Sequence, residues 1–101
     1  MPMKVFISQP MTGLTDDEIQ IQRKEAIKDL TGFLETDFEI LNSFVPNVGN
    51  ENRPLYYLGR AIQCLDEADL AYFVDGWEKS RGCRIEHESA ILYGIDILHQ
   101  V

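Results

Sequence analysis

Short apolar runs alternate with stretches of helical periodicity along this chain, and this alternation restricts the fold more than any other feature of the sequence. Strands that are separated by helices pair in parallel, with right-handed crossovers and with helices on both faces of the sheet. We therefore predict an α/β fold, a flavodoxin-like or Rossmann-like three-layer sandwich with a four-stranded parallel sheet in the order 2-1-3-4. The runs that predict the strands are residues 4–8, 38–41, 69–74 and 95–98.

The segments between these runs carry the signals of helix ends. Thr15 and Glu18 form a capping box, which predicts the start of a first helix. Pro54 suits the first turn of a second helix that runs to Leu65. Residues 82–94 end in a glycine and predict a third helix.

The composition restricts the partners. The formal net charge of −8 would repel a nucleic-acid backbone or an anionic membrane, so we expect a small ligand and neither of these. The two cysteines are too few for a disulfide framework, and no apolar stretch suits a signal peptide or a membrane span. We therefore expect a cytoplasmic protein, with residues 1–101 forming one domain that includes a long loop over residues 42–53.

Glu86 is the most unusual residue of the third predicted helix. Turning by about 100° per residue places Arg84 and Glu88 on the wet side, whereas Glu86 points the opposite way. Its neighbours on that face are Cys83, Ala90 and Tyr93. Burial of an ionised carboxylate costs several kcal/mol unless the group is paired or hydrogen-bonded. Glu86 is therefore interpreted either as a functional residue, with a role in catalysis or binding, or as one half of a structural ion pair.

The predicted topology places Glu86 beside the expected ligand site. In an open parallel sheet, ligands bind at the carboxyl ends of the strands, where the strand order reverses. The loop that starts at Ser8 and the loop over residues 75–82 should meet there. Glu86 enters from the helix that follows the second of these loops.

Three segments together resemble the nucleoside 2-deoxyribosyltransferase superfamily, in particular small phage and bacterial members. They are residues 4–14, the strand entry at residues 67–69, and residues 82–94 with the "GWEKSRGCRIEHE"-like loop and helix. The resemblance implies that Glu86 is the nucleophile and that the N-terminal loop helps to bind a nucleoside or nucleotide.

The sequence departs from the pattern of that superfamily at several positions. Glu88 replaces the glycine of the E-x-G-x-A element, Ser80 replaces a frequent aspartate, and Ala61 stands where an aspartate assists the base or sugar. Relatives commonly have a fifth strand, so we expect a partner subunit to cover a sheet edge. A homodimer or higher homo-oligomer that uses Tyr56 and Tyr57 is the corresponding prediction.

The predicted chemistry is cleavage of an N-glycosidic bond. A close carboxylate such as Glu86 stabilises or traps the positive charge that develops at the anomeric carbon. Asp75 or Glu78 could protonate the departing base, although a solvated loop acid is the alternative reading of both. The residues predicted to bind the substrate are Ser8, Gln9, Met11, Gly13, Trp77, Ser80, Arg81 and Gly82.

Each binding residue also has a purely structural interpretation. Ser8, Gln9 and Gly13 suit a turn, Ser80 suits a helix cap, and a loop tryptophan such as Trp77 often pins its loop to the body. We expect no metal and no cofactor, because Cys83 and His87 lie one helical turn apart without the rest of a ligand motif.

Two functions from different classes therefore remain open. One is cleavage or transfer of the 2-deoxyribosyl group of a nucleoside or nucleotide, by a transferase or glycosidase with Glu86 as nucleophile. The other is a noncatalytic module that binds or senses a nucleotide. A protein that acts by binding another protein is a third possibility, which a large apolar patch away from the cleft would favour.

Overall fold

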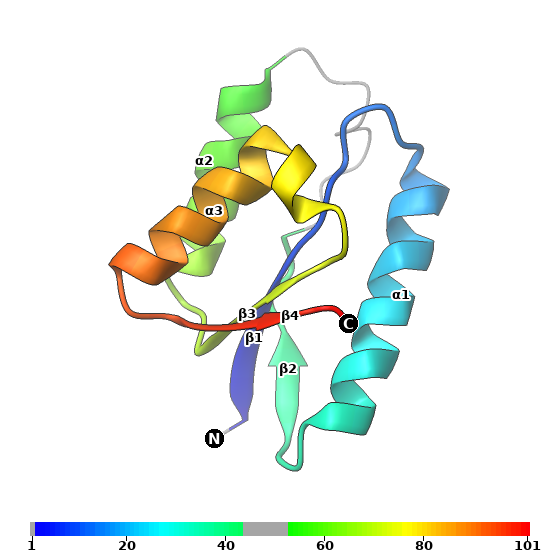
Figure 1. Cartoon of the computed structure of the whole chain (residues 1–101), viewed down its shortest axis with the longest axis vertical. Helices are drawn as coiled ribbons and strands as arrows, with labels where there is room; N and C mark the ends of the chain where they lie inside the picture. Colours follow the sequence, from blue (N-terminus) through cyan, green and yellow to red (C-terminus); the bar gives the residue numbers. More distant parts are fainter. Residues whose placement is uncertain (1, 44–52) are drawn as a thin grey trace.

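The computed structural model describes residues 2–43 and 53–101, and within them four parallel strands form one sheet between helices (Figure 1). The strand order is β2-β1-β3-β4, so the predicted fold class and strand order are confirmed. The strands are β1 (Met3–Ser8), β2 (Phe38–Ile40), β3 (Leu70–Phe73) and β4 (Asp96–His99). The helices are α1 (Asp16–Phe33), α2 (Pro54–Leu65) and α3 (Arg81–Leu92), with a short 3-10 turn η2 (Trp77–Lys79) before α3.

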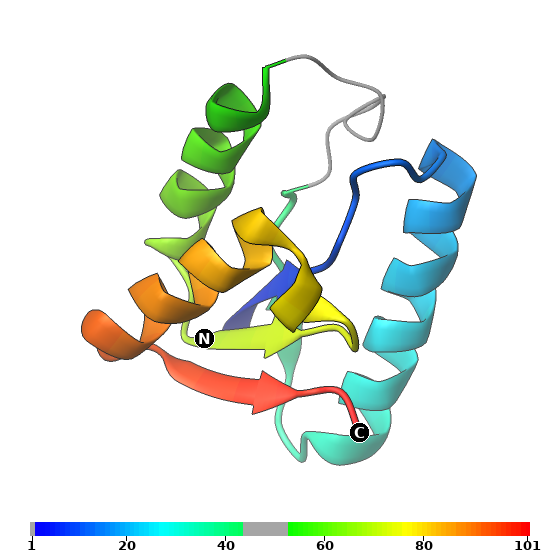
Figure 2. The ribbon, with the colours of Figure 1, turned by 45° about the horizontal axis from the view of Figure 1, so that its top comes forward.

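The sheet lies between two helical layers. α1 covers one face, while α2 and α3 lie together on the other (Figures 1 and 2). Val5 and Ile7 of β1 pack under α1 with Leu30, whereas Phe6 of β1 packs on the opposite face with Ala90 of α3. This alternation places Ser8, the last residue of β1, on the face that α3 covers.

The parallel register aligns the carboxyl ends of the two central strands. Ser8 of β1 is opposite Phe73 of β3, and the backbone N–H of Val74 donates to the Ser8 carbonyl over 2.9 Å. β2 extends the sheet from β1, and β4 extends it from β3. The strand order therefore reverses between β1 and β3, and the loops after these strands diverge to opposite faces.

The ends of the helices follow the predicted signals. The capping box at Thr15 and Glu18 is present, and Pro54 occupies the first turn of α2. Gly94 follows α3 with a φ of 73°, a left-handed conformation that glycine adopts without strain. Tyr93 was expected beside Glu86, but it caps α3 and is 83% exposed. No helix among the described residues is both long enough and apolar enough to cross a membrane.

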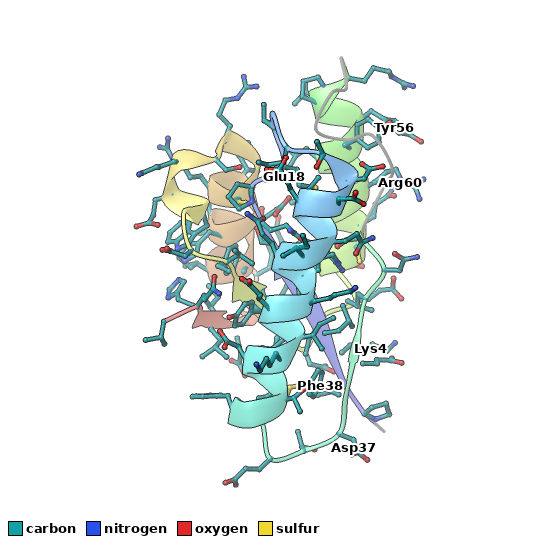
Figure 3. All side chains as sticks on the ribbon, turned by 90° about the vertical axis from the view of Figure 1, so that its right-hand side faces the viewer. Lys4, Glu18, Asp37, Phe38, Tyr56 and Arg60 are labelled. Carbon is teal, nitrogen blue, oxygen red and sulfur yellow. The ribbon has the colours of Figure 1, made fainter. Side chains whose placement is uncertain are left out.

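The two ends of the sheet differ in what surrounds them. Figure 3 shows Asp37 and Phe38 at one end of the molecule, and Glu18 and Tyr56 toward the other. At the first end, Asp37 leads into β2 and its carbonyl accepts from the N–H of Met3. The second end is the carboxyl end of the strands, where the loops after β1 and β3 begin. Most of the predicted loop over residues 42–53 lies outside the described residues.

Candidate functional site

A cleft of about 720 Å³ opens at the carboxyl end of the sheet, between the loop after β1 and helices α2 and α3. Glu86 of α3 lies in its wall, together with Phe6 and Ile7 of β1. The cleft is large enough for a nucleoside-sized ligand. Its other lining residues are Gln9, Pro10, Met11, Thr12, Ser43, Pro54, Leu55, Tyr57, Leu58, Ala61, Gly76, Lys79, Ser80, Arg81, Gly82, Cys83 and Ile85.

Glu86 is buried, as its place on α3 predicted, and only 7% of its surface is exposed. The Ser8 hydroxyl donates to its Oε1 over 2.6 Å, so the carboxylate is held by the end of the central strand β1. Burial raises the pKa of Glu86 to about 7, and the Ser8 hydrogen bond opposes that shift. Among the described residues, the partner that the structure gives this carboxylate is a hydroxyl, which favours a working group over an ion pair.

Cys83 lies one helical turn before Glu86 and also lines the cleft. Burial raises the pKa of its thiol, whereas hydrogen bonds with Ser8 and Ser80 lower it. The thiol is therefore kept in its neutral form at physiological pH. The neutral Cys83 side chain adds to the buried, uncharged surface near Glu86.

The start of α3 forms a polar and basic wall of the cleft. The Ser80 side chain caps α3 by accepting from the N–H of Cys83 over 3.3 Å. Arg81 and Gly82 follow in the first turn, and Lys79 of η2 adds a second cation that the sequence pattern did not indicate. Free N–H groups at a helix start, together with two cations, suit an anionic part of a ligand.

A buried arginine supports the opposite wall. Arg23 of α1 is only 6% exposed, and its Nη1 donates to Gln9 Oε1 over 3.1 Å and to Ser43 Oγ over 3.4 Å. Its Nη2 donates to the Leu41 carbonyl over 3.3 Å. Burial is the main cause that lowers the pKa of Arg23. The guanidinium thus joins the loop after β1 to the segment after β2.

These contacts determine what the Gln9 amide offers to a ligand. Gln9 Nε2 donates to the Ile19 carbonyl over 3.1 Å and to Gln22 Oε1 over 3.2 Å, while Oε1 faces the Arg23 guanidinium. A flipped amide would oppose donor to donor and acceptor to acceptor. Gln9 therefore offers the cleft an acceptor. Ser43 accepts from Arg23, which leaves its own O–H free to donate.

Comparison with protein families decides the relationship of the chain. A family model described as "Domain of unknown function (DUF4406)" matches residues 3–99. The chain belongs to the DUF4406 family. Comparisons with curated proteins and with solved structures give no match. The family match spans β1 to β4, so this DUF4406 domain contains every element that forms the cleft.

The DUF4406 domain brings most of the predicted site residues together. Ser8 contacts Glu86 directly, and Gln9, Met11, Ser80, Arg81 and Gly82 line the same cleft. Ala61, which the resemblance stated from the sequence aligns with an aspartate, also lines it. Tyr57, for which the sequence favours a core or interface role, lines the cleft from α2.

Four predicted site residues do not themselves line the cleft, and one of them, Ser8, is connected to it through its hydrogen bond with Glu86. Gly13 is exposed in the turn before α1, with a φ of 82°. Asp75 is exposed and borders a smaller hollow next to Gln100, whose side chain accepts from the Asp75 N–H over 2.8 Å. Trp77 packs on His87 at another side of α3, in agreement with the pinning role considered from the sequence. No group of three or more candidate metal ligands occurs in the part of the chain that the structure describes.

Proposed function

We propose that this DUF4406 domain binds a deoxynucleoside or deoxynucleotide and cleaves or transfers its 2-deoxyribosyl group at the N-glycosidic bond. The observation that carries the proposal is the Glu86 carboxylate, buried in the wall of a cleft of about 720 Å³ and held there by Ser8. A carboxylate in such surroundings is a typical working group.

The reaction needs Glu86 in its ionised form. A carboxylate oxygen attacks the anomeric carbon, and the C–N bond breaks with its electron pair going to the base. Water or a second base then attacks the same carbon and releases the sugar from Glu86. Because its pKa is about 7, both the ionised and the neutral form of Glu86 are populated near neutral pH.

The departing base also needs a proton. Asp75 and Glu78 were the sequence-based candidates, but both are exposed and neither lines the cleft. In this proposal solvent supplies the proton, and Glu86 performs the protein's part of the chemistry. Dependence on a single carboxylate fits a substrate whose leaving group is already a weak base.

The charges of the cleft orient the ligand. Lys79 and Arg81 suit a phosphate, whereas Tyr57 and Leu58 of α2 offer an apolar surface for a base. The sugar would then lie between these two ends, where Glu86 and Ser8 meet. The anionic end of the ligand would be neutralised locally in a chain whose net charge is −8.

A noncatalytic nucleotide-binding module is the second candidate. Ala61 favours it, because this residue lines the cleft where the resembling enzymes have an aspartate. Such a module would use the same walls without turnover. The two candidates therefore differ in the fate of the glycosidic bond and agree on the ligand class.

Self-association is part of the same proposal. Tyr56 is 45% exposed, and Leu55 at the rim of the cleft is 77% exposed. A symmetric homodimer through this part of α2 would cover both side chains. Sedimentation at micromolar concentration measures it, and a clean monomer contradicts a shared interface at the cleft.

The experiment is incubation of the protein with each deoxynucleoside and each deoxynucleoside monophosphate, with released base measured by chromatography. We expect release with at least one substrate, and a loss of roughly a thousand-fold or more in Glu86→Gln, because an amide is nearly isosteric but a poor nucleophile. Glu88→Gln, an exposed carboxylate on the same helix, is the matched control and should keep full activity.

The outcomes separate the candidates. Binding in a calorimetric titration without base release would support the noncatalytic module. Equal release by wild-type protein and Glu86→Gln would overturn the role of Glu86. Neither release nor binding across the panel would reject both functions.

A further inference from the structure

Both histidines and the tryptophan of the chain meet in one aromatic stack outside the cleft. The sequence has two histidines and one tryptophan, and these are His87 of α3, His99 of β4 and Trp77 of η2. The Trp77 ring is 3.9 Å from the His87 ring at 10°, and 5.4 Å from the His99 ring at 8°. Phe73 of β3 packs against the His87 ring at 4.7 Å. The stack therefore joins four elements, β3, η2, α3 and β4.

The two imidazoles meet through one nitrogen each. His87 Nε2 and His99 Nε2 are 2.9 Å apart, which is hydrogen-bonding distance. The ring centres are 5.1 Å apart at an angle of 17°, so the rings point at each other rather than overlap. A metal ion that both rings bind needs the lone pairs of the two Nε2 atoms to converge on one point beside the line that joins these atoms. The arrangement is that of an N–H···N hydrogen bond.

Such a hydrogen bond requires one proton between the two nitrogens. One ring donates and the other accepts, so the contact exists while at least one Nε2 carries no proton. When both rings are imidazolium, two N–H groups face each other and two positive charges repel. The contact therefore excludes the doubly protonated state.

The charged groups around the pair act in both directions. Burial and His99 lower the pKa of His87, while Glu88 of α3 and Glu78 of η2 raise it. The net direction is downward, which favours a neutral His87 in the folded protein. Phe73 and Trp77, the other members of the stack, carry no charge.

We propose that His87 and His99 form a pH-sensitive contact, which holds η2 and the end of β4 against α3 through one shared proton and opens when a second proton binds. The contact restrains one wall of the cleft, because Gly76 and Lys79 next to Trp77 line that wall. Acid would loosen this wall while the buried core stays packed. The proposal does not depend on the reaction at Glu86.

Nuclear magnetic resonance of the imidazole groups tests the proposal in the full chain, because only two histidines contribute signals. We expect coupled titrations, with the pKa of His87 below the ordinary 6.5. In His99→Phe, which keeps an aromatic ring on Trp77, the pKa of His87 should rise, because a like charge is removed. Two independent titrations near the ordinary value, or an unchanged His87 in His99→Phe, would overturn the shared proton.

Amide hydrogen exchange tests the opening of the wall. The Lys79 N–H donates to the Gly76 carbonyl over 3.1 Å, and the Gln100 N–H donates to the Phe73 carbonyl over 2.9 Å. After correction for the intrinsic effect of pH, we expect the protection of both amides to fall about tenfold between pH 7.5 and 5, with Ile7 unchanged. In His99→Phe this dependence should vanish. Constant protection in wild-type protein, or the same fall in the variant, would reject the proposal.

Discussion

Glu86 and His87 are neighbours on α3, yet the helix places them in two different surroundings. Glu86 faces the cleft and contacts a hydroxyl, whereas His87 faces Trp77 and His99 near the surface. Burial is the largest cause of both pKa shifts and acts in opposite directions, because it disfavours the charged form of each group. One turn of helix thus carries an acid and a base that are both shifted toward neutrality.

The difference between the two sides lies in what each neutral group contacts. On the cleft side, Glu86 accepts a hydrogen bond from Ser8 and has open space beside it. On the other side, His87 packs against the rings of Phe73 and Trp77 and contacts His99. The cleft side therefore suits binding and chemistry, and the side of the stack suits the attachment of η2 and β4.

The strongest test of this comparison is the stability of Glu86→Gln as a function of pH. The pKa of Glu86 is raised from 4.5 to about 7, so the folded state binds the proton more tightly than the unfolded state. The protonated Glu86 therefore adds to the free energy of unfolding of the wild type below pH 4.5, and this contribution is lost as the pH rises through 7. We expect Glu86→Gln to be more stable than wild type above pH 7, by roughly 3 kcal/mol.

Urea unfolding at several pH values measures this effect. The difference between Glu86→Gln and wild type should fade below pH 4.5, where both side chains are neutral. Glu88→Gln is the control and should show no such pH-dependent gain. A variant that is less stable at high pH would indicate that Glu86 is a paired structural charge.

A smaller effect is expected from Ser8→Ala. The Ser8 hydroxyl lowers the pKa of Glu86, so its removal should raise that pKa further, because the ionised carboxylate loses a hydrogen bond. The pH at which Glu86 loses its proton, measured by carbon NMR of the carboxyl group, should move upward. Ser89→Ala is the matched control, because Ser89 donates to the Ile85 carbonyl on the same helix. No movement in Ser8→Ala would show that burial alone determines the pKa.

Arg81→Ala tests the basic wall of the cleft. If a phosphate binds there, this change should weaken the binding of a deoxynucleoside monophosphate about tenfold and leave the binding of the corresponding nucleoside unchanged. Arg84→Ala is the control, because Arg84 is exposed on the same helix and does not line the cleft. Calorimetric titration of both ligands decides it. Equal losses for the two ligands would argue against a phosphate at this wall.

The smallest effect is expected on the side of the stack, from His87→Phe. Because the pKa of His87 is lowered by folding, the unfolded state takes up the proton first as the pH falls below 6.5. Proton uptake by His87 in the unfolded state should therefore lower the stability of the wild type in acid, and the variant should lack this loss. We expect a small difference between the two proteins to develop from pH 7.5 to 5, measured by urea unfolding. An equal loss of stability in both proteins would show that His87 does not contribute to the pH dependence of stability.

The fold was predictable because its signals are local. Alternating apolar runs predict the strands, and Thr15 and Pro54 predict helix starts that the structure contains. The burial of Glu86 was also predictable, since helical periodicity alone separates it from Arg84 and Glu88. These features need only the spacing of residues in one segment.

The remaining site residues depend on contacts between distant segments. Arg23 is a charged residue on a long helix, for which a solvated position is the ordinary expectation, and only the approach of Gln9 and Ser43 shows its burial. The meeting of His87 with His99 requires the parallel pairing of β4 with β3. No local pattern in the sequence carries this information.

The register of Ser8 has a consequence for motion. Ser8 ends β1, a central strand, and its carbonyl accepts from Val74 in the extension of the β1–β3 ladder. A displacement of the Ser8 backbone has to separate β1 from β3, and such separations belong to global unfolding rather than to the fraying of loops. The Ser8 end of its hydrogen bond with Glu86 is thus fixed by the most stable part of the sheet, whereas the loops around the cleft are attached by fewer backbone hydrogen bonds.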